Sequence, residues 1–226
     1  MSWITNFFTS SIGRKIIMSL TGIFLILFLI VHLIGNFQLL KSDGGEAFNL
    51  YAYFMTSNPL IKTISYGLYF FIILHTIVGI ALWAKNRKAK GQRNAMVSKA
   101  SSSWASRNMA LLGTLIFAFI LIHMGDFWLK MKLDQAPYAT YDGQSYKDLY
   151  ALCLITFSNI YFVIAYVVGM IVLGFHLWHG FQSAFQTLGI NHPRYTPIIK
   201  GLGKIFSIVV PLGFAVIPVY MYLFMN

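Results

Sequence analysis

Charged residues are scarce in this chain, and acidic residues are the scarcest of them. Only 10% of the 226 residues are charged, with 6 acids against 17 Lys and Arg residues. Hydrophobic residues make up 58% of the sequence, which is more than the core of a soluble domain of this length can bury. The composition therefore excludes an ordinary soluble protein and favours an integral membrane protein.

Cysteine is almost absent as well. Cys153 is the sole cysteine, so the sequence supports neither a disulfide framework nor a metal site built from thiolates. We expect Cys153 to be a small apolar filler. The chain also shows no internal repeat, no low-complexity segment and no change of composition that would mark a second domain. A single domain over residues 1–226 is therefore predicted.

Long runs without charge divide the sequence. They extend from Ile16 to Leu40, Thr63 to Ala84, Asn108 to Gly125, Leu149 to Pro193 and Ile205 to Asn226. A helix needs about 20 residues to cross roughly 30 Å of hydrocarbon. We predict an all-α integral membrane bundle of five transmembrane helices at about 15–40, 63–85, 107–130, 154–188 and 203–225. The stretch "LDQAPYATYDGQSYK" at 133–147 is expected to be an ordinary polar loop.

Basic residues are distributed unequally between the two sides of this bundle. One side would hold Arg14, Lys15, Lys85, Arg87, Lys88, Lys90, Arg93, Lys99, Arg107, Arg194, Lys200 and Lys204, and the other Lys41, Lys62, Lys130, Lys132 and Lys147. The positive-inside rule then predicts a cytoplasmic N-terminus and an outside C-terminus. The basic surface can meet anionic membrane lipid or an acidic soluble partner. Nucleic acid is disfavoured, because these residues lie in short loops between spans.

Histidine is the most informative residue type. His32, His75 and His123 lie in the first three spans, and His176 and His179 in the fourth. A polar ring in hydrocarbon costs free energy unless it is paired, so intramembrane histidines are functional candidates. By helical rise, His32 and His123 lie outward of the middle of their spans, His176 inward, and His75 near the middle. The sequence therefore predicts an outer pair and an inner pair.

Haem iron suits such pairs best. Zinc would need further ligands, and the spans offer neither a cysteine cluster nor carboxylates at these depths. Haem accepts two axial nitrogens on opposite faces of a flat macrocycle, which two histidines on facing helices can supply. We predict two bis-histidine haems. His176 and His179 share a helical face, and spacing alone leaves either as the ligand opposite His75.

Several motifs resemble those of a known family. They are "SSIGRKIIMSLTG" at 10–22, "VHLIGNFQLL" at 31–40, the histidines of spans two and three, and "GFHLWHGFQSAFQTLGINHPRY" at 174–195. In these motifs the sequence resembles the single-chain, five-helix, di-haem cytochrome b anchors of succinate dehydrogenases and fumarate reductases that use menaquinone. The resemblance covers nearly the whole chain and implies a multi-pass protein of a bacterial cytoplasmic membrane.

The resemblance also implies roles for individual residues. His32 would pair with His123 at the outer haem, and His75 with His176 at the inner haem, because His176 stands thirteen residues before Gly189 as the family ligand does before its helix-ending glycine. His179 would then meet an inner-haem propionate or the membrane interface. Ser19 and Trp104 are further candidates for contacts to the inner-haem propionates.

Partners follow from the same resemblance. A flavoprotein subunit that oxidises succinate or reduces fumarate and an iron–sulfur subunit would dock on the cytoplasmic face, and the whole complex could form a higher oligomer. The chain itself would not act on succinate but would pass electrons to quinone, with menaquinone the expected type, near the outer haem. Relatives place an acid there to handle quinone protons, and Asp126, one turn past His123, is our nominee.

Two other functions compete with this one. The cytochrome subunit of another respiratory enzyme, such as a hydrogenase or a formate dehydrogenase, would also bind haem but should distribute its ligands differently among the helices. A secondary transporter could use the histidines as a proton relay. It should show broken helices and an internal repeat, neither of which is apparent in the sequence.

Overall fold

Five long helices dominate the computed structural model, which describes residues 3–89 and 104–225. These helices are α2 (Ser11–Asn36), α4 (Pro59–Ala89), α6 (Met109–His123), α9 (Ile160–Thr187) and α10 (Thr196–Phe224). The first is extended by the 3-10 helix η1 (Phe37–Leu40), and α6 is extended by the π-helix η2 (Met124–Leu129) and by α7 (Lys130–Lys132). All five segments are long and apolar enough to cross a membrane. The prediction of an all-α, multi-pass membrane bundle is confirmed.

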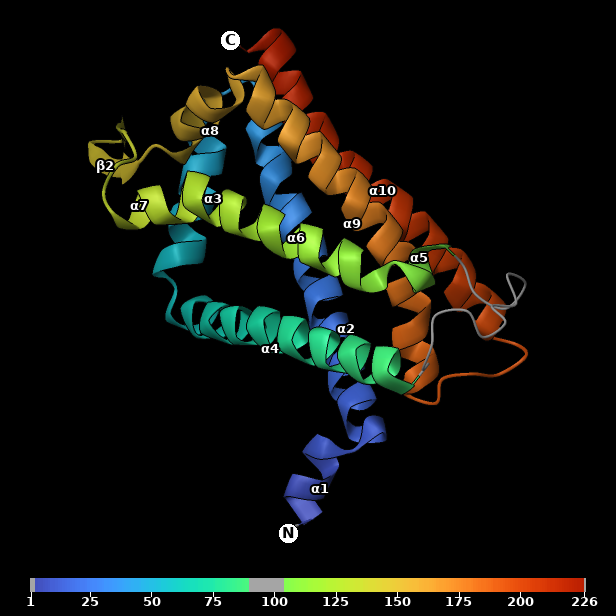
Figure 1. The fold of residues 1–226 in the computed structure, drawn as a ribbon. Helices are drawn as coiled ribbons and strands as arrows, with labels where there is room; N and C mark the ends of the chain where they lie inside the picture. Colours follow the sequence, from blue (N-terminus) through green and yellow to red (C-terminus); the bar gives the residue numbers. More distant parts are fainter. Residues whose placement is uncertain (1–2, 90–103, 226) are drawn as a thin grey trace.

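Shorter elements join the long helices. They are α1 (Trp3–Thr9), α3 (Glu46–Ser57), α5 (Trp104–Arg107), the strands β1 (Tyr138–Tyr141) and β2 (Gln144–Lys147), and α8 (Leu149–Phe157). Figure 1 shows α3, α7, β2 and α8 gathered at one end of the bundle, well away from α1. We call the end with α3, the strands and α8 the hairpin side, and the end with α1 and residues 188–195 the N-terminal side.

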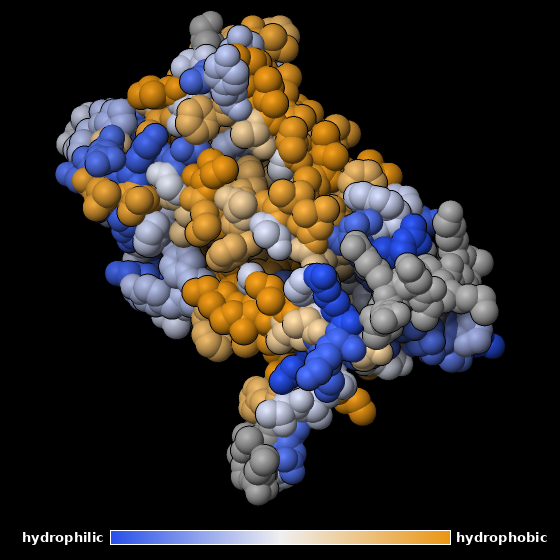
Figure 2. Space-filling model, viewed as in Figure 1, coloured by the Kyte–Doolittle hydropathy of each residue, from blue (hydrophilic) through white to orange (hydrophobic). Residues whose placement is uncertain are grey.

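The long helices pack around α9. It contacts α10, α2 and α6, while α2 also contacts α4, and α4 contacts α6. Figure 1 shows α9 and α10 side by side along most of their lengths. Hydrophobic side chains cover the visible faces of the long helices, and hydrophilic ones gather over the hairpin side and near the opposite helix ends (Figure 2). This is the surface expected of a bundle whose flanks face lipid.

A glycine of α9 lies against a proline-interrupted turn of α10. Pro211 lies inside α10 and has no N–H, so the carbonyl of Ser207, four residues earlier, lacks its usual helical donor. Gly174 of α9 faces this carbonyl, and a Cβ at Gly174 would lie only 3.1 Å from the Ser207 oxygen. The missing side chain therefore lets the two backbones meet, as small residues do in membrane helix packing.

The predicted boundaries of the spans need correction. The fourth does not begin at 154: α8 ends at Phe157, and Asn159 adopts an extended conformation and caps α9 by accepting from the Tyr161 N–H at 2.9 Å. Asparagine is a preferred N-cap, so a separate helix starts here. The fifth begins at Thr196 rather than 203, with Pro197 in its first turn.

The first and second helices are also longer than predicted. Ser10 caps α2, because its hydroxyl accepts from the Gly13 N–H at 2.9 Å, and α4 runs past Lys85 to Ala89. A run without charge marks the part that crosses hydrocarbon, whereas a helix can continue into the interface with its charged residues. Three of the basic residues used for the orientation, Lys90, Arg93 and Lys99, lie outside the described residues.

The predicted polar loop at 133–147 is a β-hairpin instead. Strands β1 and β2 pair antiparallel, with Tyr141 opposite Gln144. Asp142 and Gly143 both have positive φ, of 48° and 78°, which is the type I′ turn that Asp-Gly favours. The prediction of an ordinary loop was wrong, because Asp142 and Gly143 form a turn that lets the flanking segments pair as strands.

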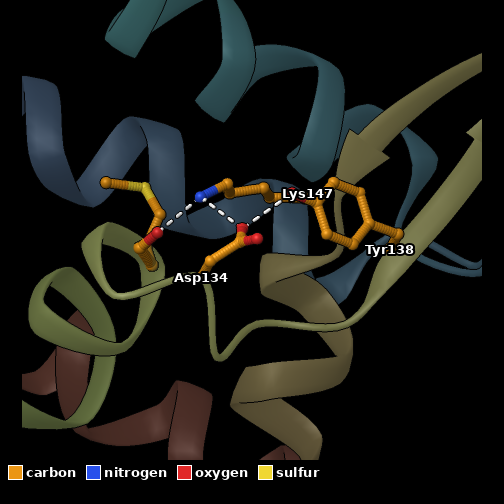
Figure 3. Close-up of polar contacts among 4 residues, drawn as sticks. Asp134, Tyr138 and Lys147 are labelled. Atoms are coloured by element: carbon orange, nitrogen blue, oxygen red, sulfur yellow. Dashed lines mark hydrogen bonds and ion pairs between the residues drawn. The ribbon is translucent and has the colours of Figure 1, made fainter.

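Polar contacts fix the hairpin side. The Lys147 ammonium donates to the Met131 carbonyl at 2.6 Å and pairs with Asp134 at 2.9 Å, and the Tyr138 hydroxyl donates to Asp134 at 2.7 Å (Figure 3). Behind the hairpin, the fully buried Asn49 of α3 makes three further bonds. Its amide donates to the Tyr141 hydroxyl and to Asp148, and its oxygen accepts from the Tyr150 N–H.

Candidate functional site

A large cavity runs between α2, α4, α6 and α9. Its volume is about 2620 Å³, whereas a pocket for a single small ligand usually measures about 300 to 1,000 Å³. The side chains of His32, His75, His123 and His176 all line it. The cavity therefore has room for more than one large group, and each of the four helices around it contributes a histidine.

The first pair of histidines joins α2 to α6. The rings of His32 and His123 have centroids 5.8 Å apart and planes at 77°. Aromatic side chains hold both rings: Phe28 stacks on His32 at 5.1 Å, and Phe119 stacks on His123 at 6.0 Å. These neighbours lie one turn earlier on the same helices, so the helical repeat positions them.

The second pair joins α4 to α9. The rings of His75 and His176 have centroids 6.3 Å apart and planes at 64°. Glycines of the neighbouring helices leave space beside both rings: a Cβ at Gly22 would lie 3.4 Å from Cε1 of His75, and one at Gly113 would lie 3.9 Å from Cε1 of His176. The structure thus brings together the two pairs that the depths of the histidines predicted. Their role as ligands stays a prediction.

The separation of the rings fits a metal between them. An imidazole nitrogen binds a transition metal at about 2 Å, and its ring centre lies roughly 1 Å farther on, so two axial imidazoles have centres roughly 6 Å apart. Both pairs match this value. Among residues 3–89 and 104–225, no group of three or more His, Cys, Asp or Glu residues could hold a metal ion. Each pair can therefore supply two nitrogens, and the remaining ligands would have to come from another group, such as a macrocycle.

One histidine of each pair has a hydroxyl group at its Nδ1 atom. For His75 this is the Thr21 hydroxyl, at 3.0 Å, and for His123 it is the Tyr166 hydroxyl, at 3.5 Å. A metal-binding histidine usually has such a partner at the nitrogen that does not bind the metal. In contrast, Nδ1 of His176 is buried and has no hydrogen-bond partner. The donor set fits two bis-histidine haems. In the second pair the two rings differ, because His75 has a hydroxyl group at Nδ1 and His176 has no partner there.

Sequence reasoning gave no role to Thr21 or Tyr166. Thr21 lies inside the motif at 10–22, but its partner His75 is 54 residues away, and Tyr166 is 43 residues from His123. The residue pattern of a single helix does not show which residues of another helix its side chains contact. A polar residue buried in an apolar run was the available signal, because a buried hydroxyl needs a partner.

Asp126 is not an ordinary charge at a helix end. Its side chain is buried in the π-helix η2, and Oδ2 accepts from the Tyr166 hydroxyl at 3.0 Å. Tyr166 lines the cavity, whereas Asp126 does not. A molecule in the cavity beside His123 would therefore meet the tyrosine first, with the carboxyl group behind it.

The remaining candidates divide into two groups. Ser19 is buried, lines the cavity and donates its hydroxyl to the Lys15 carbonyl at 3.0 Å. His179 also lines the cavity and is half-buried, one turn from His176. Trp104 is exposed, and its ring packs edge-on against Phe175 at 5.5 Å. The structure therefore brings Ser19 and His179 to the cavity and leaves Trp104 outside its lining.

Comparison with known proteins adds no relative. No protein-family model, curated protein or solved structure matches this chain.

Proposed function

We propose that this chain is the membrane anchor and electron-transfer subunit of a succinate dehydrogenase or fumarate reductase complex, with two b haems. One observation carries the proposal: two histidine pairs from four helices lie at two positions in one cavity, with ring centroids 5.8 and 6.3 Å apart. His32 and His123 would hold the outer haem, and His75 and His176 the inner one. When bound, the haems supply one-electron transfer along the membrane normal.

The remaining residues support this role in different ways. Ser19 and His179 both line the cavity, so they are candidates for polar contacts to the inner haem. Phe28 and Phe119 stack on the rings of the outer pair, His32 and His123, and give them apolar neighbours. The protein would set the haem potentials through histidine ligation, hydrogen bonds to the ligands and local dielectric.

The outer end of the cavity would also meet quinone, and menaquinone is the expected type. Asp126 and Tyr166 are the candidates to hold a quinone proton, since the tyrosine lines the cavity and donates to the buried carboxyl group. A hydroxyl and a carboxyl group in hydrogen-bond contact can relay a proton without charged groups facing lipid.

The distribution of basic residues supports the proposed orientation. Arg14, Lys85 and Arg194 are examples on the N-terminal side, and the positive-inside rule makes that side cytoplasmic. An iron–sulfur subunit, with a flavoprotein subunit beyond it, would then dock there, near the inner haem. The residues that act on succinate or fumarate would lie in those subunits.

A reduced minus oxidised visible spectrum of the purified membrane complex tests the proposal, with haem measured against polypeptide. The expected result is two b haems per chain that succinate reduces when the soluble subunits are present. Reduction by hydrogen or formate instead of succinate would assign the chain to another respiratory complex. A folded protein without haem would overturn the proposal, and the histidines would have to be reassigned to a proton or ion path.

A further inference from the structure

Thr21 of α2 reaches across to a histidine of the neighbouring helix. Its hydroxyl oxygen lies 3.0 Å from Nδ1 of His75 in α4, and the Thr21 side chain is buried. The next residue, Gly22, has no side chain to obstruct the same ring, since a Cβ there would lie 3.4 Å from Cε1 of His75. Two consecutive residues of α2 thus give the imidazole both a polar partner and the space to reach it.

The hydrogen bonds of Thr21 determine which way the proton points. A hydroxyl group has one proton, and the Thr21 oxygen also lies 2.8 Å from the Ile17 carbonyl, which can only accept. If the proton pointed to His75, two oxygen lone pairs would face each other at this short distance. Both contacts are attractive only when Thr21 donates to Ile17 and accepts from an Nδ1–H group of His75.

This arrangement favours the tautomer of His75 that carries its proton on Nδ1. With the proton on Nδ1, a neutral imidazole has its free lone pair on Nε2, and that nitrogen can bind a metal. We propose that Thr21 is a positioning residue that holds His75 in the tautomer able to bind iron through Nε2 and that increases the electron donation of this ligand. The inference rests on the proposed haem function, and it extends that function to a residue outside the ligand set.

The opposite ligand has no such partner. Nδ1 of His176 is buried without a hydrogen bond, and the hydroxyl near His123 belongs to the other pair. Within the inner pair, Thr21 therefore acts on one ring alone. A hydrogen bond from Nδ1–H makes the imidazole a stronger donor, which stabilises oxidised iron and lowers its reduction potential. Removal of the Thr21 hydroxyl should raise the potential of the inner haem and leave that of the outer haem unchanged.

Three substitutions in the full chain, purified with its haems, test this inference. Thr21→Val removes the hydroxyl at nearly constant volume, and Thr21→Ser retains it. Thr156→Val is the matched control, because Thr156 is also buried and donates to its own helix at Leu152, in α8. Redox titration of each haem and low-temperature electron paramagnetic resonance of the oxidised protein are the readouts.

We expect Thr21→Val to change the oxidation equilibrium of one haem roughly tenfold, which is a rise of about 59 mV for a one-electron couple. The low-spin resonance signal of the same haem should shift, while Thr21→Ser and Thr156→Val should resemble the unsubstituted protein. Loss of one haem in Thr21→Val alone would also support the inference. Unchanged potentials and signals in Thr21→Val, or equal changes in Thr21→Ser, would overturn it. Absence of haem from the unsubstituted protein would instead refute the proposed function.

Discussion

Tyr166 of α9 donates its phenolic proton to Oδ2 of Asp126 at a distance of 3.0 Å, and both side chains are buried. The contact joins two membrane-crossing segments, since Asp126 lies in η2, the π-helical extension of α6. A buried carboxyl group without such a donor would lose its hydration and have no hydrogen bond to compensate for that loss. The hydrogen bond from Tyr166 therefore offsets the cost of burying the Asp126 carboxyl group.

The first prediction concerns this contact. Tyr166→Phe should lower the free energy of unfolding by about 1 to 3 kcal/mol, because it leaves the Asp126 carboxyl group buried without its donor. Asp126→Asn should cost less, since an amide oxygen can still accept from Tyr166. Thermal unfolding of the chain in detergent, followed by circular dichroism, measures both. Tyr161→Phe, at an exposed tyrosine of the same helix, is the control. Equal losses in the two main variants would contradict the prediction.

The second prediction separates two neighbouring histidines. His176→Ala should remove one of two haems and leave the spectrum of the other, whereas His179→Ala should retain both. The reason is geometric, because the ring that faces His75 is that of His176. Haem content per chain and the reduced minus oxidised spectrum are the measurements. Loss of both haems from membrane-inserted His176→Ala protein would argue against two separate sites.

The third prediction concerns the hairpin side. Asn49→Leu should destabilise the packing of β1, β2 and α8 on α3, at a cost of about 1 to 3 kcal/mol, because the part-buried Tyr150 N–H loses its acceptor. Amide hydrogen exchange should accelerate across 138–157 and not in α10. Asn108→Ala serves as the control, since the Asn108 amide donates to the Trp104 carbonyl of its own segment, away from the hairpin side. Uniform acceleration over the whole chain would point to a general loss of stability instead.

The fourth prediction is a pH dependence of the same region. The hydrogen bond from Tyr138, followed by the hydrogen bond and charge of Lys147, lowers the pKa of Asp134 below its ordinary value of 3.8. A depressed carboxyl pKa stabilises the fold above the ordinary value, and that stabilisation is lost as the pH falls through the lowered value. The protection factors of the hairpin amides, which are corrected for the intrinsic pH dependence of exchange, should therefore fall as the pH drops below about 3.8. In Asp134→Asn protein this acid-dependent loss of protection should disappear; its persistence would assign the effect to another carboxyl group.

Much of the architecture could be predicted from the sequence because lipid imposes strict conditions. A helix across hydrocarbon must be long and nearly free of charge, so runs such as Thr63 to Ala84 locate the spans directly. The same regularity gives the depth of a residue, which is why His32 could be matched to His123 before any contact was known. Helical ends were less predictable, since charged residues continue a helix into the interface.

Contacts between helices were the part that sequence reasoning missed. Depth shows which residues lie at one level, but not how each helix is rotated, so Thr21 could not be assigned to His75. The break at Asn159 and the turn at Asp142 and Gly143 are different cases. Both residue types are known cap and turn formers, and local chemistry was sufficient to predict them. The break at Asn159 was missed because it lies within a long apolar run. The turn at Asp142 and Gly143 was missed because the surrounding sequence is polar.

Helix α9 has a consequence for how this bundle can change during evolution. Tyr166 touches His123 in one pair, and His176 belongs to the other pair. Ten residue steps along the helix separate these two positions and span about 15 Å. A one-residue insertion between these positions would turn one end of α9 against the other by about 100°. The number of residues between Tyr166 and His176 therefore fixes how the two sites are oriented relative to each other. Substitutions can accumulate along this stretch far more easily than insertions or deletions.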